Sequence, residues 1–240
     1  MTSARDRHAN TGRTIWKKLR SSPWVHLVAA VLLIALVHGF FIKPYVVPSG
    51  SMEPTLHTGD RIYVDRIQNA VQSPEHGDVV VFNASESWEP LEERSGIRWL
   101  AGAIGDAFGF GPSNHKALVK RAIGLPGDTV TCCSSNGAVE VNGQALDETY
   151  VYDEYPFIPG KLDCESKPAS RRCFAPINVP AGQYLVMGDH RSNSSDSVYA
   201  CRQPLAEAGT AQSCARFVQR EDIVGEVFLR VWPLSRAGGI

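Results

Sequence analysis

The chain contains 240 residues, carries a formal net charge of −1 and is 43% hydrophobic. This length is sufficient for one sizeable hydrophobic core or for two small ones. Its 21 glycines and 15 prolines are typical of a turn-rich globular domain and not of a disordered chain. Because the net charge is close to zero, no overall field attracts a polyanion, and we expect no nucleic-acid partner.

The N-terminal part of the chain predicts a membrane anchor. Residues 1–23 are rich in Lys and Arg, whereas residues 24–42 contain no Asp, Glu, Lys or Arg. About 20 apolar residues span a bilayer as a helix, so we predict a transmembrane signal-anchor helix over 24–42. The positive-inside rule then puts the tail 1–23 in the cytoplasm and the domain 43–240 outside it. The run is too long for a cleaved secretory signal, and a buried core helix behind a basic leader is the alternative.

Six cysteines agree with a location outside the cytoplasm, where disulfides persist. They are Cys132, Cys133, Cys164, Cys173, Cys201 and Cys214. Short polar loops favour the local pairs Cys164–Cys173 and Cys201–Cys214. Cys132 and Cys133 are adjacent, and a bridge between them would be strained. The sequence has no CxxC pair and no zinc-finger spacing of His, so we expect no metal site.

Short apolar or alternating runs, separated by turn residues, follow the predicted anchor. They predict β-strands at 60–65, 78–82, 118–123, 129–131, 139–141, 183–187 and 223–231. Asn142-Gly143 adds a hairpin signal. Many short strands of this kind indicate an all-β domain of the barrel or sandwich type.

Three segments interrupt the strand pattern and are expected to be insertions or excursions. Residues 88–117 have roughly helical apolar spacing, which suits an amphipathic helix on a membrane or a surface helix packed on the domain. Residues 150–180 are polar, rich in proline and closed by a cysteine pair, and residues 200–216 contain the other expected pair.

A serine turn lies just beyond the apolar segment. Ser51 is nine residues past position 42, within residues 48–54, whose sequence is PSGSMEP. Proline and glycine fix the direction of such a turn and let the chain approach closely. The segment is therefore either an ordinary turn or a nucleophile held at the lipid–water boundary.

A serine nucleophile requires a nearby base at neutral pH. None of His57, His76, His115 and His190 stands in the context of a Ser-His-Asp triad. Lys120 lies instead within an apolar predicted strand, where burial would lower its pKa and leave a neutral amine. The alternative role for this lysine is a charge that guards a strand edge.

Together these motifs resemble the bacterial type I signal peptidases (leader peptidases), membrane-anchored serine endopeptidases with a Ser/Lys dyad. The resemblance rests on residues 48–55, 59–65, 120–128 and 188–197, in the family's order, and on a closing strand at 217–226. It implies a mainly β fold of coiled antiparallel sheets with one N-terminal transmembrane helix. It also implies a monomeric enzyme that needs no cofactor.

The resemblance assigns the reacting groups. Ser51 would be the nucleophile and Lys120 the general base. The Ser51 backbone N–H and the Ser49 hydroxyl would form the oxyanion hole, where donors face the charge that develops on the scissile carbonyl. Ser194 matches the family serine that hydrogen-bonds and orients the lysine.

The resemblance also assigns a polar network behind the site, to Asp189, Arg191 and Asp196. Two positions depart from the family pattern. His190 stands in place of a usual Asn, and Val198 stands in place of a usual Arg beside Asp196. We therefore expect the local salt bridge of Asp196 to be absent.

The implied activity is removal of signal peptides from exported preproteins after small residues, in the Ala-x-Ala pattern, through an acyl-enzyme. Val47, Leu56 and Val119 flank the motifs and are candidate walls of the shallow substrate subsites. The implied location is the bacterial plasma membrane, crossed once, with the N-terminus cytoplasmic. Signal peptides and the lipid bilayer are the expected partners.

Two other functions fit parts of the sequence. A catalytically silent relative could serve as a scaffold in pilus or surface-protein assembly, but it would have no need of both Ser51 and Lys120. A self-cleaving Ser/Lys repressor would be cytosolic and would carry a DNA-binding segment, whereas this chain has a predicted anchor and six cysteines.

Overall fold

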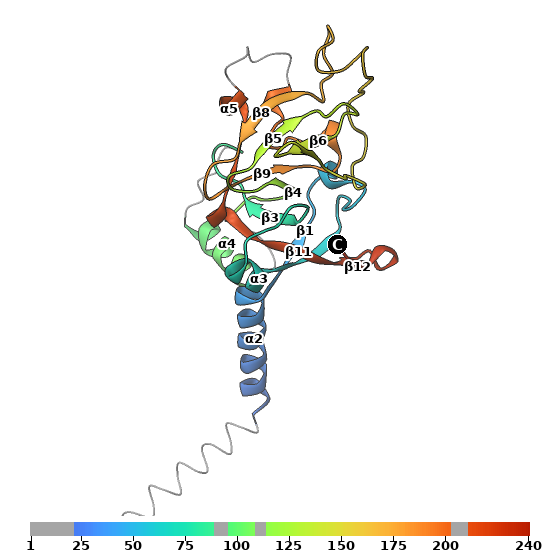
Figure 1. Ribbon diagram of the computed structural model, residues 1–240. Coiled ribbons are helices and arrows are strands. Elements are labelled where there is room, and N and C mark those ends of the chain that lie inside the picture. The colour runs from blue at the N-terminus through green and yellow to red at the C-terminus, as the bar shows by residue number, and fades with distance from the viewer. Residues whose placement is uncertain (1–21, 89–95, 109–113, 203–210) are drawn as a thin grey trace, which may run out of the picture.

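The computed structural model describes residues 22–88, 96–108, 114–202 and 211–240, and two antiparallel sheets dominate it (Figure 1). The strands of the larger sheet are β1 (Ile42–Val46), β2 (Arg61–Asp65), β3 (Val79–Asn83), β4 (Ala117–Gly124), β9 (Gln183–Met187), β10 (Val218–Gln219), β11 (Ile223–Trp232) and β12 (Gly238–Gly239). Their order is β1-β2-β11-β3-β4-β9-β10, with β12 paired to β11. The mainly β fold class predicted from the sequence is confirmed.

The smaller sheet follows β4 in the chain. Its strands are β5 (Thr129–Cys132), β6 (Val139–Val141), β7 (Gln144–Ala145) and β8 (Phe174–Asn178), in the order β7-β6-β5-β8. Asn142 and Gly143 have positive φ angles between β6 and β7, as the hairpin signal predicts.

The predicted strands are all present, but β1 and β8 were missed, as were the two-residue strands β7 and β12. β1 contains Pro44 and β8 contains Pro176, and both strands lie at a sheet edge, where a residue without an N–H is tolerated. Describing the whole of 150–180 as an excursion from the β core was therefore wrong for Phe174–Asn178, which pairs with β5.

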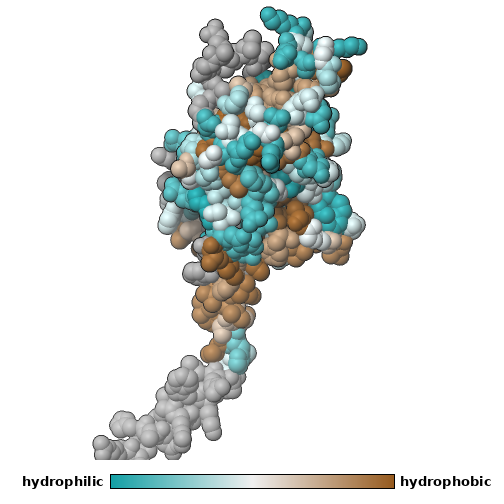
Figure 2. Space-filling model, in the orientation of Figure 1, coloured by the Kyte–Doolittle hydropathy of each residue, from teal (hydrophilic) through white to brown (hydrophobic). Residues whose placement is uncertain are grey.

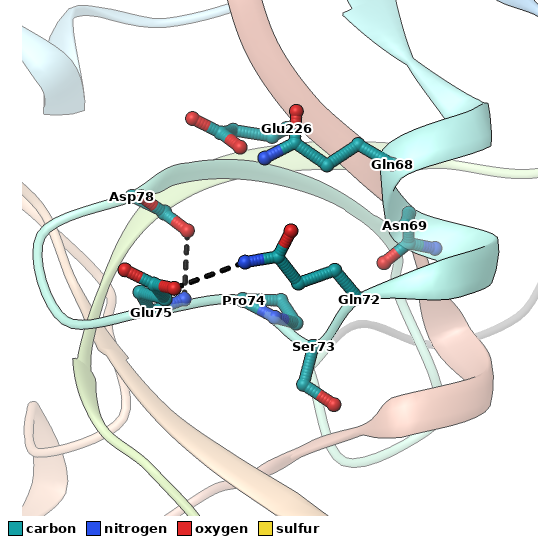
Figure 3. Close-up of a pocket in the computed structure, with 8 residues that line it drawn as sticks. All are labelled: Gln68, Asn69, Gln72, Ser73, Pro74, Glu75, Asp78 and Glu226. Atoms are coloured by element: carbon teal, nitrogen blue, oxygen red, sulfur yellow. Dashed lines mark hydrogen bonds between the residues drawn. The ribbon is translucent and has the colours of Figure 1, made fainter.

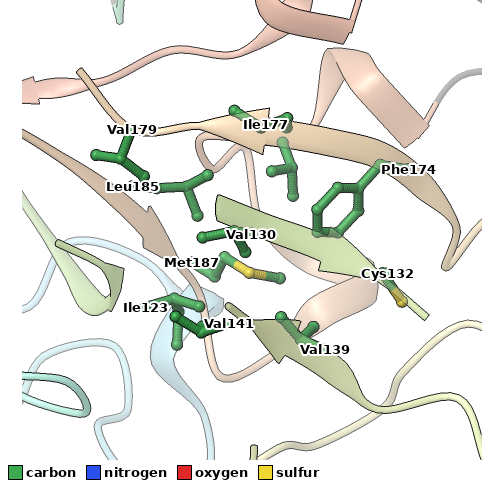
Figure 4. Close-up of a cluster of buried hydrophobic side chains, with 11 residues drawn as sticks. Ile123, Val130, Cys132, Val139, Val141, Phe174, Ile177, Val179, Leu185 and Met187 are labelled. Carbon is green, nitrogen blue, oxygen red and sulfur yellow. The ribbon is translucent and has the colours of Figure 1, made fainter. Parts of the chain in front are cut away.

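A buried apolar cluster joins the two sheets (Figure 4). Leu185 and Met187 of β9 lie in it with Val130 of β5 and Ile177 of β8, and all four side chains are 0% exposed. Full burial of a side chain of this size contributes roughly 1.5–3 kcal/mol. The cluster therefore holds the smaller sheet against the end of the larger one.

A second cluster lies within the larger sheet and beneath the serine turn. It contains Met52 and Leu56 from the turn region, Val47 from the chain before it, and Ile62 and Val119 from strands β2 and β4. Alternation of buried and exposed positions along β2 places Ile62 on this face. The serine turn is thus anchored to the sheet by its own apolar neighbours.

Helix α2 (Pro23–Phe40) extends below the sheets as a separate arm (Figure 1). Leu27, Val28, Leu32 and Leu33 expose more than half of their surface, and the arm forms an apolar surface in Figure 2. Over the part of the chain that the structure describes, no helix combines the length and apolar character needed to cross a membrane. The prediction of a transmembrane helix over 24–42 is therefore not confirmed, and residues 1–21 of the predicted tail lie outside the described residues.

Three shorter helices accompany the sheets. They are α3 (Arg66–Val71), α4 (Ile97–Phe108) and α5 (Ala211–Cys214). The Asp65 carboxylate caps α3 by accepting the N–H groups of Ile67 and Gln68. Helix α4 contacts α2 and confirms the helical spacing predicted within 88–117.

Every described cysteine is in a disulfide. The predicted pairs Cys164–Cys173 and Cys201–Cys214 are present. The partners of the adjacent Cys132 and Cys133 were left open by the sequence, and the structure joins these two residues to each other.

Candidate active site

Ser51 occupies the middle of a single 3-10 turn, Gly50–Met52, and only 6% of it is exposed. The turn is closed by a hydrogen bond from the Glu53 N–H to the Gly50 carbonyl. Met52, the next residue after Ser51, is 1% exposed and lies in the apolar cluster beneath. Burial of Met52 therefore fixes the turn and directs the serine toward β4.

Lys120 meets Ser51 from the centre of β4. Its Nζ lies 2.6 Å from the Ser51 Oγ and 3.2 Å from the Val119 carbonyl oxygen. Only 4% of the lysine is exposed. The two residues are separated by 69 positions in the sequence, and the structure confirms that they come together.

The surroundings of Lys120 favour a neutral amine. Burial lowers its pKa to about 8, against the opposing charge of Asp196, while the cation Arg216 lowers it further. A neutral amine is a proton acceptor, whereas an ammonium is only a donor. At neutral pH the lysine is thus near the point at which it accepts the proton of Ser51.

Arg121, the neighbour of Lys120, points to the other face of β4 and pairs with an acid. Its Nε and Nη2 donate to the two carboxylate oxygens of Asp189 at 2.8 and 2.6 Å. Thr55 also donates to Asp189, at 2.6 Å, and the guanidinium stacks 3.9 Å from the centre of the Tyr150 ring. The alternation of β4 therefore separates a buried base from a buried ion pair.

Gly188 allows the 188–197 segment to pack directly against the nucleophile. A Cβ at this position would lie 2.5 Å from the Ser51 carbonyl oxygen and closer still to the Ser194 Oγ. The His190 N–H donates to the same Ser51 carbonyl at 3.1 Å. Only glycine permits this approach, so the backbone of the serine turn is held from behind by the segment that carries Asp189.

Ser194 is close to the dyad but does not have the predicted contact. It is 4% exposed, and its Oγ has no hydrogen-bond partner among the described residues. The Lys120 Nζ uses Ser51 and the Val119 carbonyl instead. The predicted hydrogen bond from Ser194 to the lysine is therefore not present.

Asp196 is fully buried and has a salt bridge that the sequence did not predict. It accepts the N–H groups of Gly188 and Val198, each at 3.3 Å, and its Oδ2 lies 3.5 Å from the Arg202 Nη1. The local bridge from position 198 is absent, as expected with Val198, but a different cation takes its place. Arg202 supplies the cation from within 200–216, a segment that the sequence marked only as an insertion.

Arg191 is fully buried and is held by acidic residues that lie outside every sequence motif. It donates to Glu148 at 3.2 Å and to the Gly188 carbonyl at 3.0 Å. Glu154 lies 3.5 Å from the same guanidinium. Both acids precede the 188–197 segment by more than thirty residues in the chain, and no local pattern marks them as its partners.

His190, the other departure from the family pattern, bridges two acidic residues beside the site. Its Nε2 is 3.2 Å from Asp153 and its Nδ1 is 3.7 Å from Glu53. Its ring also lies edge-on to Tyr152, with centroids 5.1 Å apart. The histidine connects the serine turn with the 150–180 segment.

Of the four remaining predicted site residues, one is exposed and three are buried. Ser49 is exposed, with its Oγ 3.4 Å from the Ser51 Oγ. Val47 and Val119 are 2% and 5% exposed, whereas Leu56 has no exposed surface. All three belong to the same buried apolar cluster, and their role as walls of the substrate subsites stays a prediction.

A separate polar hollow lies beside α3 (Figure 3). Its lining residues are Gln68, Asn69, Gln72, Ser73, Pro74, Glu75, Asp78 and Glu226. Burial raises the pKa of the Asp78 and Glu226 carboxyls. None of the predicted site residues lines this hollow, so it is distinct from the Ser51 and Lys120 pair.

Comparison with known proteins identifies the family of this chain. The model of the family described as signal peptidase, peptidase S26, matches residues 21–232. A probable signal peptidase I of Mycobacterium leprae is 37% identical over 239 aligned positions, which cover 93% of this chain and 81% of that protein. A signal peptidase I of Mycobacterium tuberculosis is 38% identical over 221 positions, with 88% and 72% covered. A probable signal peptidase I-2 of Synechocystis is 34% identical over 236 positions, with 95% and 84% covered. This chain therefore belongs to the S26 family of signal peptidases.

Proposed function

We propose that this signal peptidase removes signal peptides from exported preproteins with Ser51 as the nucleophile and Lys120 as its general base. The single observation that carries the proposal is the 2.6 Å contact between the Lys120 Nζ and the Ser51 Oγ. Burial of both residues, which lowers the pKa of the lysine to about 8, supports a neutral amine as the base.

The reaction is an acyl transfer in two steps. Lys120 takes the proton of Ser51 while the Oγ bonds to the carbonyl carbon of the scissile peptide. The lysine then gives this proton to the leaving amine, which departs as the mature protein. A water, deprotonated by the same lysine, attacks the resulting ester, frees the carboxyl end of the signal peptide and regenerates the Ser51 hydroxyl.

The oxyanion formed in each step is stabilised by the Ser51 N–H and the Ser49 hydroxyl. The support is that the Ser49 Oγ lies 3.4 Å from the Ser51 Oγ, next to the carbon that Ser51 attacks. A donor in this place stabilises the transition state more than the ground state.

The substrate binds as an extended strand along the first half of β4. β9 pairs with β4 from Arg121 onward, and among the described strands none pairs with residues 117–120 on that side. An extended peptide that adds to this edge would bring its scissile bond to Ser51. Val47 and Val119 form the apolar floor against which only small side chains fit.

Helix α2 holds the enzyme in a lipid bilayer. Its apolar Leu, Val and Ile residues are exposed, and Trp24 at its start is 73% exposed. Apolar surface of this kind is favourably transferred to lipid. The orientation predicted from the charges, with residues 1–23 cytoplasmic and residues 43–240 outside, belongs to this proposal.

The dyad is tested by cleavage of a preprotein that carries an Ala-x-Ala signal. We expect Ser51→Ala and Lys120→Ala to lower the cleavage rate by about 10³-fold or more. Ser73→Ala and Lys161→Ala, which change exposed residues of the same types, should cleave like the unchanged protein. A normal rate in either dyad variant would refute the assignment, and binding without cleavage by the unchanged enzyme would instead favour a silent scaffold.

The membrane role of α2 is tested by flotation of the full chain with phospholipid vesicles. The double variant Leu32→Lys/Leu33→Lys places two charges on the exposed surface of α2. We expect it to lose most of its flotation, because each Lys costs roughly 2.5–3.5 kcal/mol in the centre of a bilayer. Equal flotation of the two proteins would show that another surface binds the lipid.

A further inference from the structure

Four of the six cysteines lie together where β5 ends and β8 begins. The antiparallel register ends with the pair Cys132 and Phe174, and Cys133 and Cys173 are the next residues beyond this pair on the two segments. The Cys133 and Cys173 Sγ atoms lie within 4.8 Å of each other. Cys133 and Cys173 therefore lie near enough to exchange partners, although each is bonded to a different cysteine.

The sulfur atoms of this four-cysteine cluster (Cys132, Cys133, Cys164 and Cys173) are within reach of one another. The Sγ atoms of Cys133, Cys164 and Cys173 all lie within 4.8 Å of each other. Cys132 is bonded to Cys133, and the Cys164 Sγ lies 3.6 Å from the Cys132 carbonyl oxygen. Each of the two disulfides thus has the other as its immediate neighbour.

The present pairs and the alternative pairs differ in what they connect. Cys132–Cys133 joins adjacent residues and Cys164–Cys173 closes a loop with a separation of 9, so neither links β5 to β8. The pairs Cys133–Cys173 and Cys132–Cys164 would join the two strand ends and enclose residues 134–172. Long enclosed loops lose the most unfolded-state entropy, so the alternative pairing would restrict the chain more.

We propose that the four-cysteine cluster is a thiol–disulfide exchange site that interconverts these two pairings. The reagent is an external thiolate, from a small thiol or from a thiol oxidoreductase. Cys164 is the exposed member, Cys133 and Cys173 are half-buried, and Cys132 is 4% exposed. The reagent therefore enters at Cys164.

The exchange needs no net oxidant or reductant. The external thiolate attacks the Cys164 sulfur, forms a mixed disulfide and releases the Cys173 thiolate. Cys173 attacks Cys133, forms Cys133–Cys173 and releases the Cys132 thiolate. Cys132 then attacks the mixed disulfide at Cys164, forms Cys132–Cys164 and returns the external thiolate, so that two disulfides remain throughout.

The enclosed loop contributes to the active site. It carries Glu148, which binds Arg191, and Asp153, which binds His190. Exchange at the cluster therefore changes the covalent constraint on the segment behind the nucleophile. The site does not depend on catalysis, and we expect the same exchange in the Ser51→Ala protein.

Tryptic mapping of the full chain distinguishes the two pairings. Cleavage after Lys and Arg separates residues 122–161, with Cys132 and Cys133, from 162–171, with Cys164, and from 173–191, with Cys173. The present pairing joins only 162–171 to 173–191, whereas the alternative pairing joins all three peptides. The protein is incubated in mixtures of reduced and oxidised glutathione, blocked with N-ethylmaleimide and mapped without reduction.

We expect the three-peptide species to appear alongside the two-peptide species in every mixture that contains the glutathione thiolate, and to be absent from protein incubated without a thiol. Recovery of the two-peptide species alone in every mixture would overturn the proposal. The linked peptides of Cys201 and Cys214 should remain paired in every sample and serve as the internal control.

A second variant removes the competition between pairings. Cys132→Ser/Cys164→Ser leaves Cys133 and Cys173 as the only cysteines of the cluster. We expect oxidised glutathione to join residues 122–161 to 173–191 in this protein, with the Cys201–Cys214 peptides linked as a sign of correct folding. If Cys133 and Cys173 both remain free for N-ethylmaleimide while Cys201–Cys214 forms, the two sulfurs do not meet and the proposal fails.

Discussion

Lys120 and Arg121 lie on opposite faces of β4, and their buried basic groups have different surroundings. Lys120 contacts two neutral oxygens, those of Ser51 and Val119, whereas Arg121 is held by both oxygens of the Asp189 carboxylate. Loss of its proton therefore stabilises the buried Lys120 side chain. The Asp189 carboxylate instead offsets the cost of burying the charged Arg121 guanidinium. Residues that are adjacent and similar in charge thus have different roles, one in proton transfer and one in holding the polypeptide in place.

Replacing Lys120 by Met should give the largest effect and should leave the fold intact. We expect a loss of about 10³-fold or more in cleavage rate without a fall in the free energy of unfolding, since an apolar side chain suits this buried position. Cleavage assays and urea unfolding measure the two quantities. A loss of more than about 2 kcal/mol in stability would show that Lys120 is as structural as Arg121.

Replacing Arg121 by Met tests the other face. The Asp189 carboxylate would then be buried without its partner, which costs about 3–5 kcal/mol. Urea unfolding measures the loss, and Lys161→Met, at an exposed position, should change stability by less than about 0.5 kcal/mol. The double variant Arg121→Met/Asp189→Leu should recover part of the loss; if it does not, the ion pair is not the source.

Two single substitutions near Lys120 should give the smallest effect, a shift in the pH dependence of cleavage. The cleavage rate should rise with pH through a midpoint near the lysine pKa of about 8, because only the neutral amine accepts a proton. Asp196 raises this pKa and Arg216 lowers it. Asp196→Asn should therefore move the midpoint of kcat/KM to lower pH and Arg216→Gln to higher pH. Shifts in the same direction would contradict the electrostatic origin.

The strand pattern was predictable because its strands are either short alternating runs, such as β6, or continuous buried runs rich in apolar residues, such as β9. β9 and β6 match the predicted ranges 183–187 and 139–141. The missed strands β1 and β8 each contain a proline, which argues against a strand unless the strand lies at a sheet edge. Whether a strand lies at an edge depends on the order of all strands in the sheet, and it cannot be predicted from a short stretch of sequence.

The candidate site was predictable only in part. The serine turn and the unusual lysine are visible as local features, and the family resemblance joined them across 69 residues. The ion pair of Asp196 was missed because its partner Arg202 comes from an insertion. The bridge between Cys132 and Cys133 could not be chosen from the sequence, because six cysteines allow 15 connectivities.

The position of Arg202 has a practical consequence for anyone who shortens this enzyme. Residues 200–216 look like a dispensable surface loop, yet Arg202 directly follows Cys201 and neutralises the buried Asp196. A truncation confined to residues 203–210 retains the arginine and its neighbouring disulfide. A deletion of the whole segment leaves the buried Asp196 carboxylate without its cation, so the boundary of the cut decides whether the trimmed protein remains an active protease.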